Sequence, residues 1–205
     1  AFSGTKSMYM YSTNTSYAAL ILPEFAPAVN TLQLSFVAMK TNTSYTHALH
    51  VGVITNPNDI STFVPIDTVA PSVLNEHELF EIPFNTYTGA GGRIAIVSPD
   101  NVYSYPYIDN IDVDVIPTCP RPIDVVSVGV HSDTIVADWT ERGSATEWQI
   151  CYGVSPIDPT LGQGTIIAGV MAHPYAIPNL SNDSIDGMYV RSVCGPGDTS
   201  RWSFM

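Results

Sequence analysis

The feature that most constrains this fold is a short proline-rich stretch in the middle of the chain. Pro117, Pro120 and Pro122 lie within six residues of one another. Each proline fixes its own φ, lacks a backbone donor and pushes the residue before it toward an extended conformation. Strand-like residues flank the stretch on both sides, so it joins the last strand of one β-domain to the first strand of another. The sequence therefore predicts two domains, over residues 1–117 and 118–205, with separate cores.

Composition and charge narrow the possible partners. The chain has 205 residues, of which 45% are hydrophobic and only 13% are charged. The net charge is −12, and the seven basic residues are scattered singly. Nucleic acid and anionic membranes are therefore not expected as partners, because no basic stripe could displace phosphate counterions. No apolar run approaches the length that crosses a bilayer, so we expect no membrane insertion.

Strand signals dominate the first half of the chain. Eight segments rich in β-branched and aromatic residues are separated by turn formers, and they cover residues 6–12, 17–22, 32–39, 47–55, 62–66, 79–84, 93–97 and 107–116. Their spacing predicts an all-β sandwich or jelly roll. The pentapeptide Thr-Asn-Thr-Ser-Tyr occurs twice, at 13–17 and 41–45, and each copy predicts a turn between strands.

The second half resembles a Bacteroides-type fibronectin type III domain. The matching pieces, in order, are Cys119-Pro-Arg-Pro, Asp138-Trp-Thr, Trp148-Gln-Ile-Cys-Tyr-Gly, Leu180, Tyr189-Val-Arg-Ser-Val-Cys and Gly197-Asp-Thr-Ser-Arg-Trp-Ser. Asp186 stands where the family usually has its corner tyrosine. The last strand stops early at Met205, so we expect the parent protein to continue beyond this residue.

Residues 1–117 resemble a MAM-like jelly roll, the module of gingipain-type adhesin domains. The matching segments are Ser3-Gly-Thr-Lys-Ser, Leu32-Gln-Leu-Ser-Phe-Val-Ala, Val51-Gly-Val-Ile-Thr-Asn-Pro-Asn-Asp and Tyr107-Ile-Asp-Asn-Ile. They cover the latter two-thirds of the usual module. The resemblance therefore implies that the first strands lie before Ala1 or come from another chain.

We expect no catalytic residues. Ser3 and Lys6 fit the SxxK pattern of serine acyl-enzymes, but that motif works from a helix and needs partner motifs that do not follow here. His47 and His50 are three residues apart, which on a strand directs them to opposite faces. The segment Gly89–Gly92 lacks the lysine of a phosphate-binding loop.

Asp109 is the candidate metal ligand. Alternation along the strand 107–116 assigns one face to the core, and this face contains Tyr107, Asp109, Ile111, Val113 and Val115. A carboxylate on such a face needs compensation. Calcium would provide it, and the jelly-roll resemblance implies calcium at this position, although the usual acidic partner near the domain start is absent. Backbone hydrogen bonds are the alternative.

Tyr103 and Tyr105 are the candidate ligand-binding residues. They belong to the tyrosine-rich segment Asn101-Val-Tyr-Ser-Tyr-Pro-Tyr107. Exposed tyrosines could stack on the sugar rings of a glycan or dock a protein partner. The alternative is that they cap one end of the sandwich.

The fibronectin resemblance implies a disulfide between Cys119 and Cys194, because the two positions fall at the same pole of that fold. Such a bridge indicates an oxidising compartment and an extracellular or cell-surface location. Cys151 lies on the face opposite Trp148 and Tyr152, so it is either a free thiol or an intermolecular link.

Three Asp-Ser/Thr-apolar tripeptides match the acceptor pattern of Bacteroides-type O-glycosylation. Their hydroxyl residues are Thr68, Thr134 and Ser184. All three fall in or beside predicted turns, so we expect at least one of them to be modified.

These features predict a non-catalytic fragment of an extracellular bacterial surface protein that acts in adhesion or ligand binding. Its partner would be a glycan or a protein ligand on a cell surface. Two alternatives stay open from the sequence. One is an accessory carbohydrate-binding region of a secreted hydrolase, and the other is a structural subunit of a surface filament, which the expected missing strands and Cys151 would suit.

Overall fold

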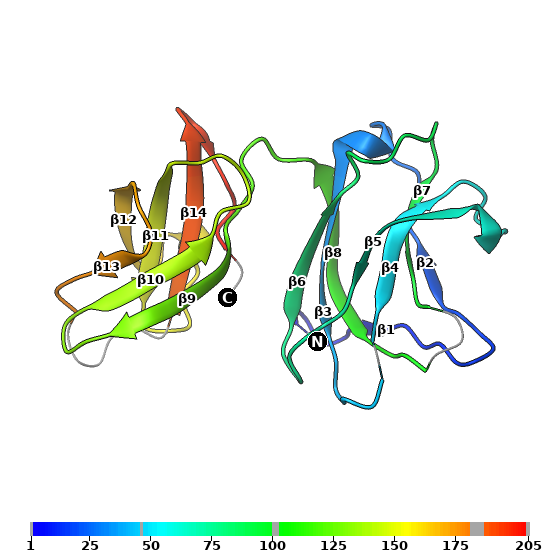
Figure 1. The fold of residues 1–205 in the computed structure, drawn as a ribbon, viewed down its shortest axis with the longest axis horizontal. Coiled ribbons are helices and arrows are strands. Elements are labelled where there is room, and N and C mark those ends of the chain that lie inside the picture. The colour runs from blue at the N-terminus through cyan, green and yellow to red at the C-terminus, as the bar shows by residue number, and fades with distance from the viewer. Residues whose placement is uncertain (1, 46, 100–102, 181–186, 204–205) are drawn as a thin grey trace. The chain divides into compact units, whose positions relative to one another are not determined.

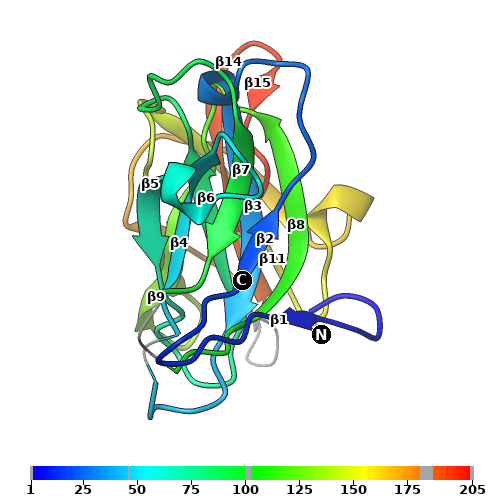
Figure 2. The same ribbon diagram turned by 90° about the vertical axis from the view of Figure 1, so that its right-hand side faces the viewer.

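The computed structural model describes residues 2–45, 47–99, 103–180 and 187–203. The chain divides into two compact units, Ala1–Ile116 and Pro117–Met205, with the boundary one residue before the expected one. Both units consist of antiparallel strands (Figures 1 and 2). The predicted all-β sandwich fold class is confirmed. Within the described ranges, no helix is long and apolar enough to cross a membrane.

The first unit is an eight-stranded sandwich. Its strands are β1 (Met8–Tyr9), β2 (Ala19–Ile21), β3 (Leu32–Met39), β4 (Leu49–Ile54), β5 (Phe63–Val69), β6 (Glu78–Pro83), β7 (Arg93–Val97) and β8 (Tyr107–Val115), with short 3-10 turns η1 (Val29–Thr31) and η2 (Ile60–Thr62). One sheet has the order β1-β8-β3-β6 and the other β2-β7-β4-β5. These two strand orders, in which each sheet combines strands from the beginning and the end of the unit, are those of a jelly roll. β1 and β2 occupy edge positions, although we had expected the first strands to lie before Ala1 or to come from another chain.

The core of the first unit lies between these two sheets. β3 and β4 supply its centre, since Leu34, Phe36, Val51 and Val53 are fully buried. Gly52 is required where β4 meets β5, because a Cβ atom there would clash with the backbone of Val64. This close approach coincides with a register shift between the two strands.

A bulge in β8 makes one predicted alternation wrong. Asn110 has a φ of 50°, and the pairing of β8 with β3 shifts register between Ser35 and Val37. The extra residue reverses the in–out alternation along the strand. Ile108 therefore fills the core, with 1% of its surface exposed, and Val113 packs on the core beyond the bulge. Tyr107 and Asp109, which we had assigned to the core face, are half-exposed instead. Ile111 and Val115, which we had assigned to the same face, are exposed.

The second unit is a seven-stranded sandwich. Its strands are β9 (Ile123–Val130), β10 (Ile135–Thr140), β11 (Glu147–Gly153), β12 (Thr165–Val170), β13 (Tyr175–Ile177), β14 (Gly187–Gly195) and β15 (Asp198–Thr199), with one 3-10 turn, η3 (Pro159–Leu161). The sheets have the orders β13-β10-β9 and β12-β11-β14-β15. Ala137, Trp139, Trp148, Ile150 and Val190 pack between them.

A disulfide joins Cys119 to Cys194, as expected. The two Cα atoms lie 5.7 Å apart across a sequence separation of 75 residues. The bridge ties the segment before β9 to the end of β14. It therefore closes nearly the whole second unit into one covalent loop.

Cys151 is a free, buried thiol. It points away from the core of the sandwich, but the loop between β11 and β12 covers it, and its Sγ donates to the carbonyl oxygen of Gln163 at 3.3 Å. Burial raises the pKa of this thiol. Of the two roles left open by the sequence, the structure therefore favours the free thiol, because a buried sulfur cannot reach a second chain.

Candidate ligand-binding site

Tyrosines line one face of the two-stranded ribbon formed by β1 and β8. Tyr9 pairs with Tyr107, and the pairing continues beyond the strands through hydrogen bonds from the Met10 amide to the Pro106 carbonyl and between Ser12 and Ser104. Successive residues along each segment therefore point to opposite faces of the ribbon. The inward-facing residues are buried, namely Met10, Ser12, Ser104, Pro106 and Ile108, whereas the outward-facing residues are Tyr9, Tyr11, Tyr103, Tyr105 and Tyr107.

The outward tyrosines form cross-strand pairs. The ring centroids of Tyr9 and Tyr107 lie 6.1 Å apart, and those of Tyr11 and Tyr105 lie 6.3 Å apart. These are contact distances for tilted aromatic pairs. Tyr9 is 62% exposed and Tyr11 is 49% exposed. The ribbon therefore presents ring surface to solvent.

A loop adds one more ring to this surface. Tyr45, the last residue of the second Thr-Asn-Thr-Ser-Tyr copy, lies 5.2 Å from Tyr105 and 6.0 Å from Tyr103 between ring centroids. Both Tyr45 and Tyr103 remain partly open to solvent. We call the resulting surface the tyrosine platform, and its six members are Tyr9, Tyr11, Tyr45, Tyr103, Tyr105 and Tyr107.

The buried ring of His47 packs against two members of the platform. The ring of His47 meets Tyr105 edge-on at 5.4 Å and Tyr45 at 6.3 Å. Its Nε2 lies 3.3 Å from Asn42 Oδ1, and its Nδ1 has no hydrogen-bond partner among the described residues. Burial of the ring lowers the pKa of His47, and the positive charge of Lys40 lowers it further by a smaller amount. The hydrogen bond with Asn42 raises this pKa, but its effect is smaller than that of burial. The imidazole is therefore neutral at neutral pH.

The chemistry of the platform is that of uncharged aromatic rings with polar tips. Each phenol offers an apolar face for stacking and a hydroxyl group that can donate or accept a hydrogen bond. No carboxylate, ammonium or guanidinium group belongs to the six-ring set. The platform can therefore hold a ligand that has flat apolar patches between hydroxyl groups.

Asp109 lies beside the platform and is engaged by backbone amides. Its Oδ2 accepts from the amides of Phe2 and Ser3 at 2.9 and 3.4 Å, and its Oδ1 accepts from the amide of Asn110 at 2.8 Å. The Asn110 amide, followed by those of Phe2 and Ser3, lowers the pKa of Asp109. These neighbours offer N–H groups rather than the oxygen ligands that calcium takes.

Among the residues that the structure describes, no group of three or more His, Cys, Asp or Glu side chains could hold a metal ion. The amide donors are the alternative compensation that the sequence left open for Asp109. Calcium at Asp109 stays a prediction.

The predicted modification sites are placed differently from one another. Thr68 is exposed but lies within β5 rather than at a turn, and its Oγ1 is 2.8 Å from His50 Nδ1. Thr134 is half-buried at the turn before β10, where its hydroxyl donates to Asp133 Oδ1. Ser184 lies outside the described residues. O-glycosylation of these residues stays a prediction.

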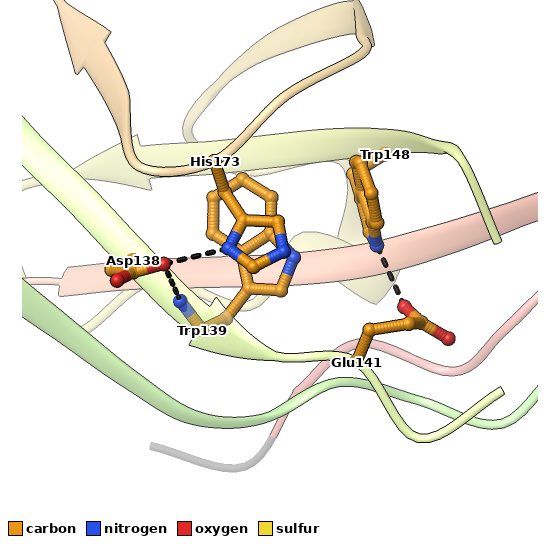
Figure 3. Close-up of polar contacts among 5 residues, drawn as sticks. All are labelled: Asp138, Trp139, Glu141, Trp148 and His173. Atoms are coloured by element: carbon orange, nitrogen blue, oxygen red, sulfur yellow. Dashed lines mark hydrogen bonds and ion pairs between the residues drawn. The ribbon is translucent and has the colours of Figure 1, made fainter. Parts of the chain in front are cut away.

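In the second unit, a histidine and an aspartate form a close pair that the sequence did not indicate (Figure 3). His173 Nδ1 lies 2.7 Å from Asp138 Oδ1, which also accepts from the Trp139 amide at 2.9 Å. The His173 hydrogen bond, followed by the Trp139 amide, lowers the pKa of Asp138. The imidazole covers Trp139 with 4.7 Å between ring centroids and meets the edge of Trp148 at 5.2 Å.

This pair packs against the two tryptophans. A His–Asp pair in an acyl-transfer site needs a nucleophile on the other ring nitrogen, and the described part of the chain gives His173 no hydroxyl or thiol partner. Trp148 Nε1 donates to Glu141 Oε2 (Figure 3). The same oxygen accepts from the buried Ser192 hydroxyl. Glu141 therefore satisfies Trp148 and Ser192, whereas the buried Trp139 Nε1 has no hydrogen-bond partner among the described residues.

Comparison with known proteins assigns neither a family nor a function. No protein-family model matches the chain, and no curated protein matches it. Among solved structures, the glycoside hydrolase domain of Endo-D from Streptococcus pneumoniae R6 matches with a TM-score of 0.39 and 11% identity. The match covers 96% of this chain and 32% of that one, so the chain spans about a third of the length of that structure. A similarity of this size is too low to transfer a fold or an activity.

Proposed function

We propose that this chain is a non-catalytic part of an extracellular bacterial surface protein, and that it binds a glycan on the tyrosine platform. The observation that carries the proposal is the face of the β1–β8 ribbon. The tyrosines of this face alternate with buried residues, so the tyrosine rings point to solvent and not into the core of the sandwich. Contiguous exposed apolar surface is a feature of interaction sites.

The platform suits carbohydrate because a sugar ring combines an apolar C–H face with hydroxyl groups at its edge. Tyrosine matches both features, with a ring for the face and a hydroxyl for the edge. The platform is also rigid, because its strands are hydrogen-bonded and His47 packs beneath Tyr45 and Tyr105. A preorganised surface loses little side-chain freedom on binding.

The extracellular location rests on the Cys119–Cys194 bridge, because disulfides persist in oxidising compartments. The two-sheet architecture of each unit is compatible with the MAM-like and fibronectin type III resemblances, which describe surface proteins of this kind. An accessory region of a secreted hydrolase would use the same platform and differ only in the rest of the parent protein.

The filament-subunit alternative loses the two features that favoured it. β1 and β2 occupy edge positions in the sandwich, so no strand from another chain is needed to make eight. Cys151 is buried under the β11–β12 loop and is not available for an intermolecular link. These observations therefore favour ligand binding over a structural role in a filament.

A glycan array tests the proposal. We expect the wild-type chain to bind a subset of glycans, the Tyr103→Ala/Tyr105→Ala and Tyr9→Ala/Tyr11→Ala variants to lose that binding, and Tyr17→Ala to retain it. Tyr17 ends the first Thr-Asn-Thr-Ser-Tyr copy and is 47% exposed, but it makes no ring contact with any described residue, which makes it a matched control. Binding that survives both double substitutions in folded protein would refute the proposed site.

A further inference from the structure

The tyrosine platform has a repeat along the ribbon. Tyr9 and Tyr107 form one pair, and Tyr11 and Tyr105 form the next. Tyr103 follows two residues before Tyr105, and Tyr45 contacts both of these rings, at 6.0 and 5.2 Å. Two residues of an antiparallel strand advance by about 6.8 Å. Three aromatic positions therefore follow one another at a spacing on the order of one sugar unit.

From this repeat we infer that the platform binds an extended, uncharged polysaccharide chain, with consecutive sugars on the three tyrosine positions. The inference rests on the proposed glycan-binding function and adds the class of glycan. A site for a single terminal sugar would need a pocket that encloses one ring. The platform instead exposes Tyr9 at one end and Tyr103 at the other, so a ligand could extend past both.

The charges around the platform favour a neutral chain. None of the six phenol rings carries a cationic group that could pair with a uronate or a sulfate. The positive charge of Lys40 does act on His47, which packs against these rings. Immediately beyond Tyr107, β8 continues with Asp109 and, after the bulge, with Asp112 and Asp114. The whole chain has a net charge of −12. An acidic polysaccharide would therefore be repelled both along β8 and by the overall field.

A protein partner fits this surface less well than a polysaccharide. A stable protein interface buries about 800 Å² on each side and is built around a continuous apolar core. The platform is one ribbon wide, and the next residues along β8 are the polar Asp109 and Asn110. A periodic row of rings on one ribbon matches a ligand that itself repeats.

Chain-length dependence tests the inference. Calorimetric titrations would use neutral oligosaccharides of one to six sugars from the cello-, malto- and N-acetylchito- series, with oligogalacturonides and heparin fragments as charged comparators. If a sugar stacked on a tyrosine contributes as much as a second aromatic ring does, each added position raises affinity about 2- to 12-fold, which corresponds to about 0.5–1.5 kcal/mol. We expect affinity for at least one neutral series to rise from one to three sugars and then to level off, with no binding of the charged chains.

Removing one end of the row shortens the site. The Tyr9→Ala/Tyr107→Ala variant should level off at two sugars, whereas Tyr17→Ala should keep the wild-type profile. Because the effect is a change in the length at which affinity levels off, it differs from a general loss of binding by a misfolded protein. Circular dichroism and thermal unfolding of both variants check the fold.

Several results would overturn the inference. Platform-dependent array binding with equal affinity for one and six sugars would replace the extended chain by a single-sugar site and leave the proposed function standing. Array binding without binding of any neutral series, or a preference for the charged chains, would overturn the ligand class alone. Binding to intact cells that survives glycosidases but not proteases would assign the platform to a protein partner. Failure of both the array and the titrations would contradict the proposed function as well.

Discussion

The ring of Tyr45 lies 5.2 Å from the ring of Tyr105, and the edge of His47 meets both of them. This contact joins the loop after β3 to the segment before β8, which are sixty residues apart in the sequence (105 − 45). The loop tyrosine and His47 therefore hold the ring of Tyr105 in place beside the other tyrosines of the ribbon. The stability and the binding of the platform should therefore depend on different members of the set.

Alanine substitutions should separate these two roles. Tyr11→Ala removes one exposed cross-strand pair, so it should lower the free energy of unfolding by at most about 1 kcal/mol. Tyr105→Ala removes a half-buried ring that contacts Tyr11, Tyr45 and His47, so it should cost more. Urea unfolding measures both values. Equal costs would mean that Tyr105 does not organise the platform.

Acid should weaken the platform through His47. Its pKa is lower in the folded state than the unperturbed value of about 6.5, so the unfolded chain binds the proton more readily. The contribution of neutral His47 to the stability of the first unit should be fully present above pH 6.5. It should be lost as the pH falls through 6.5 toward the lower pKa of the folded state. Unfolding and glycan binding measured from pH 7.5 to 5 would show this loss.

The matched variant for this test is His47→Asn. Asparagine does not titrate in this range, and it tolerates the positive φ of 50° at this position. Its pH profile between 7.5 and 5 should be flatter than that of the wild type. An identical decline in both proteins would assign the acid sensitivity to another group.

Removal of the disulfide should destabilise the second unit alone. Replacing both Cys119 and Cys194 by alanine opens a loop of about 75 residues, which in the chain-entropy model costs at most about 4.5 kcal/mol. Because the cores of the two units are separate clusters, the unfolding transition of the first unit should not move. Differential scanning calorimetry resolves the two transitions. A matching shift of both would contradict separate cores.

The loop over Cys151 should depend on Gly164. A Cβ atom at this residue would lie 2.7 Å from Cys151 Sγ, and its φ is +83°. Gly162 has a similar φ of +73° but open space around it, so Gly162→Ala measures the backbone strain alone. Gly164→Ala should cost about 1–3 kcal/mol of strain plus the steric clash. It should also speed the reaction of Cys151 with a thiol reagent, which should be slow in the native wild type.

The sequence predicted what local patterns can encode. Strand periodicity and turn residues gave the all-β fold, and the placement of Cys119 and Cys194 in the fibronectin resemblance gave the disulfide. Tyr103 and Tyr105 stood out because aromatics cluster in their segment. Tyr9, Tyr11 and Tyr45 were missed, although the alternation of Tyr9 with Tyr11 and the tyrosine that ends the repeated pentapeptide were visible signals.

The remaining differences come from nonlocal geometry. The bulge at Asn110 depends on pairing between β8 and β3, and a one-residue shift of register moved Tyr107 and Asp109 off the core face. The burial of Cys151 depends on a loop that folds back over a sheet, which periodicity does not reveal. The contact between His173 and Asp138 likewise joins residues 35 positions apart.

NMR spectra of the tyrosine ring carbons and protons test directly whether a glycan binds on the tyrosine platform. The spectra would be recorded during titration with the glycan that binds best on the array. We expect the signals of the six platform tyrosines to shift together and to saturate at one affinity. The signals of Tyr17 and of the second-unit residues Tyr152, Tyr175 and Tyr189 should stay in place. Shifts confined to tyrosines outside the platform would contradict binding on the platform.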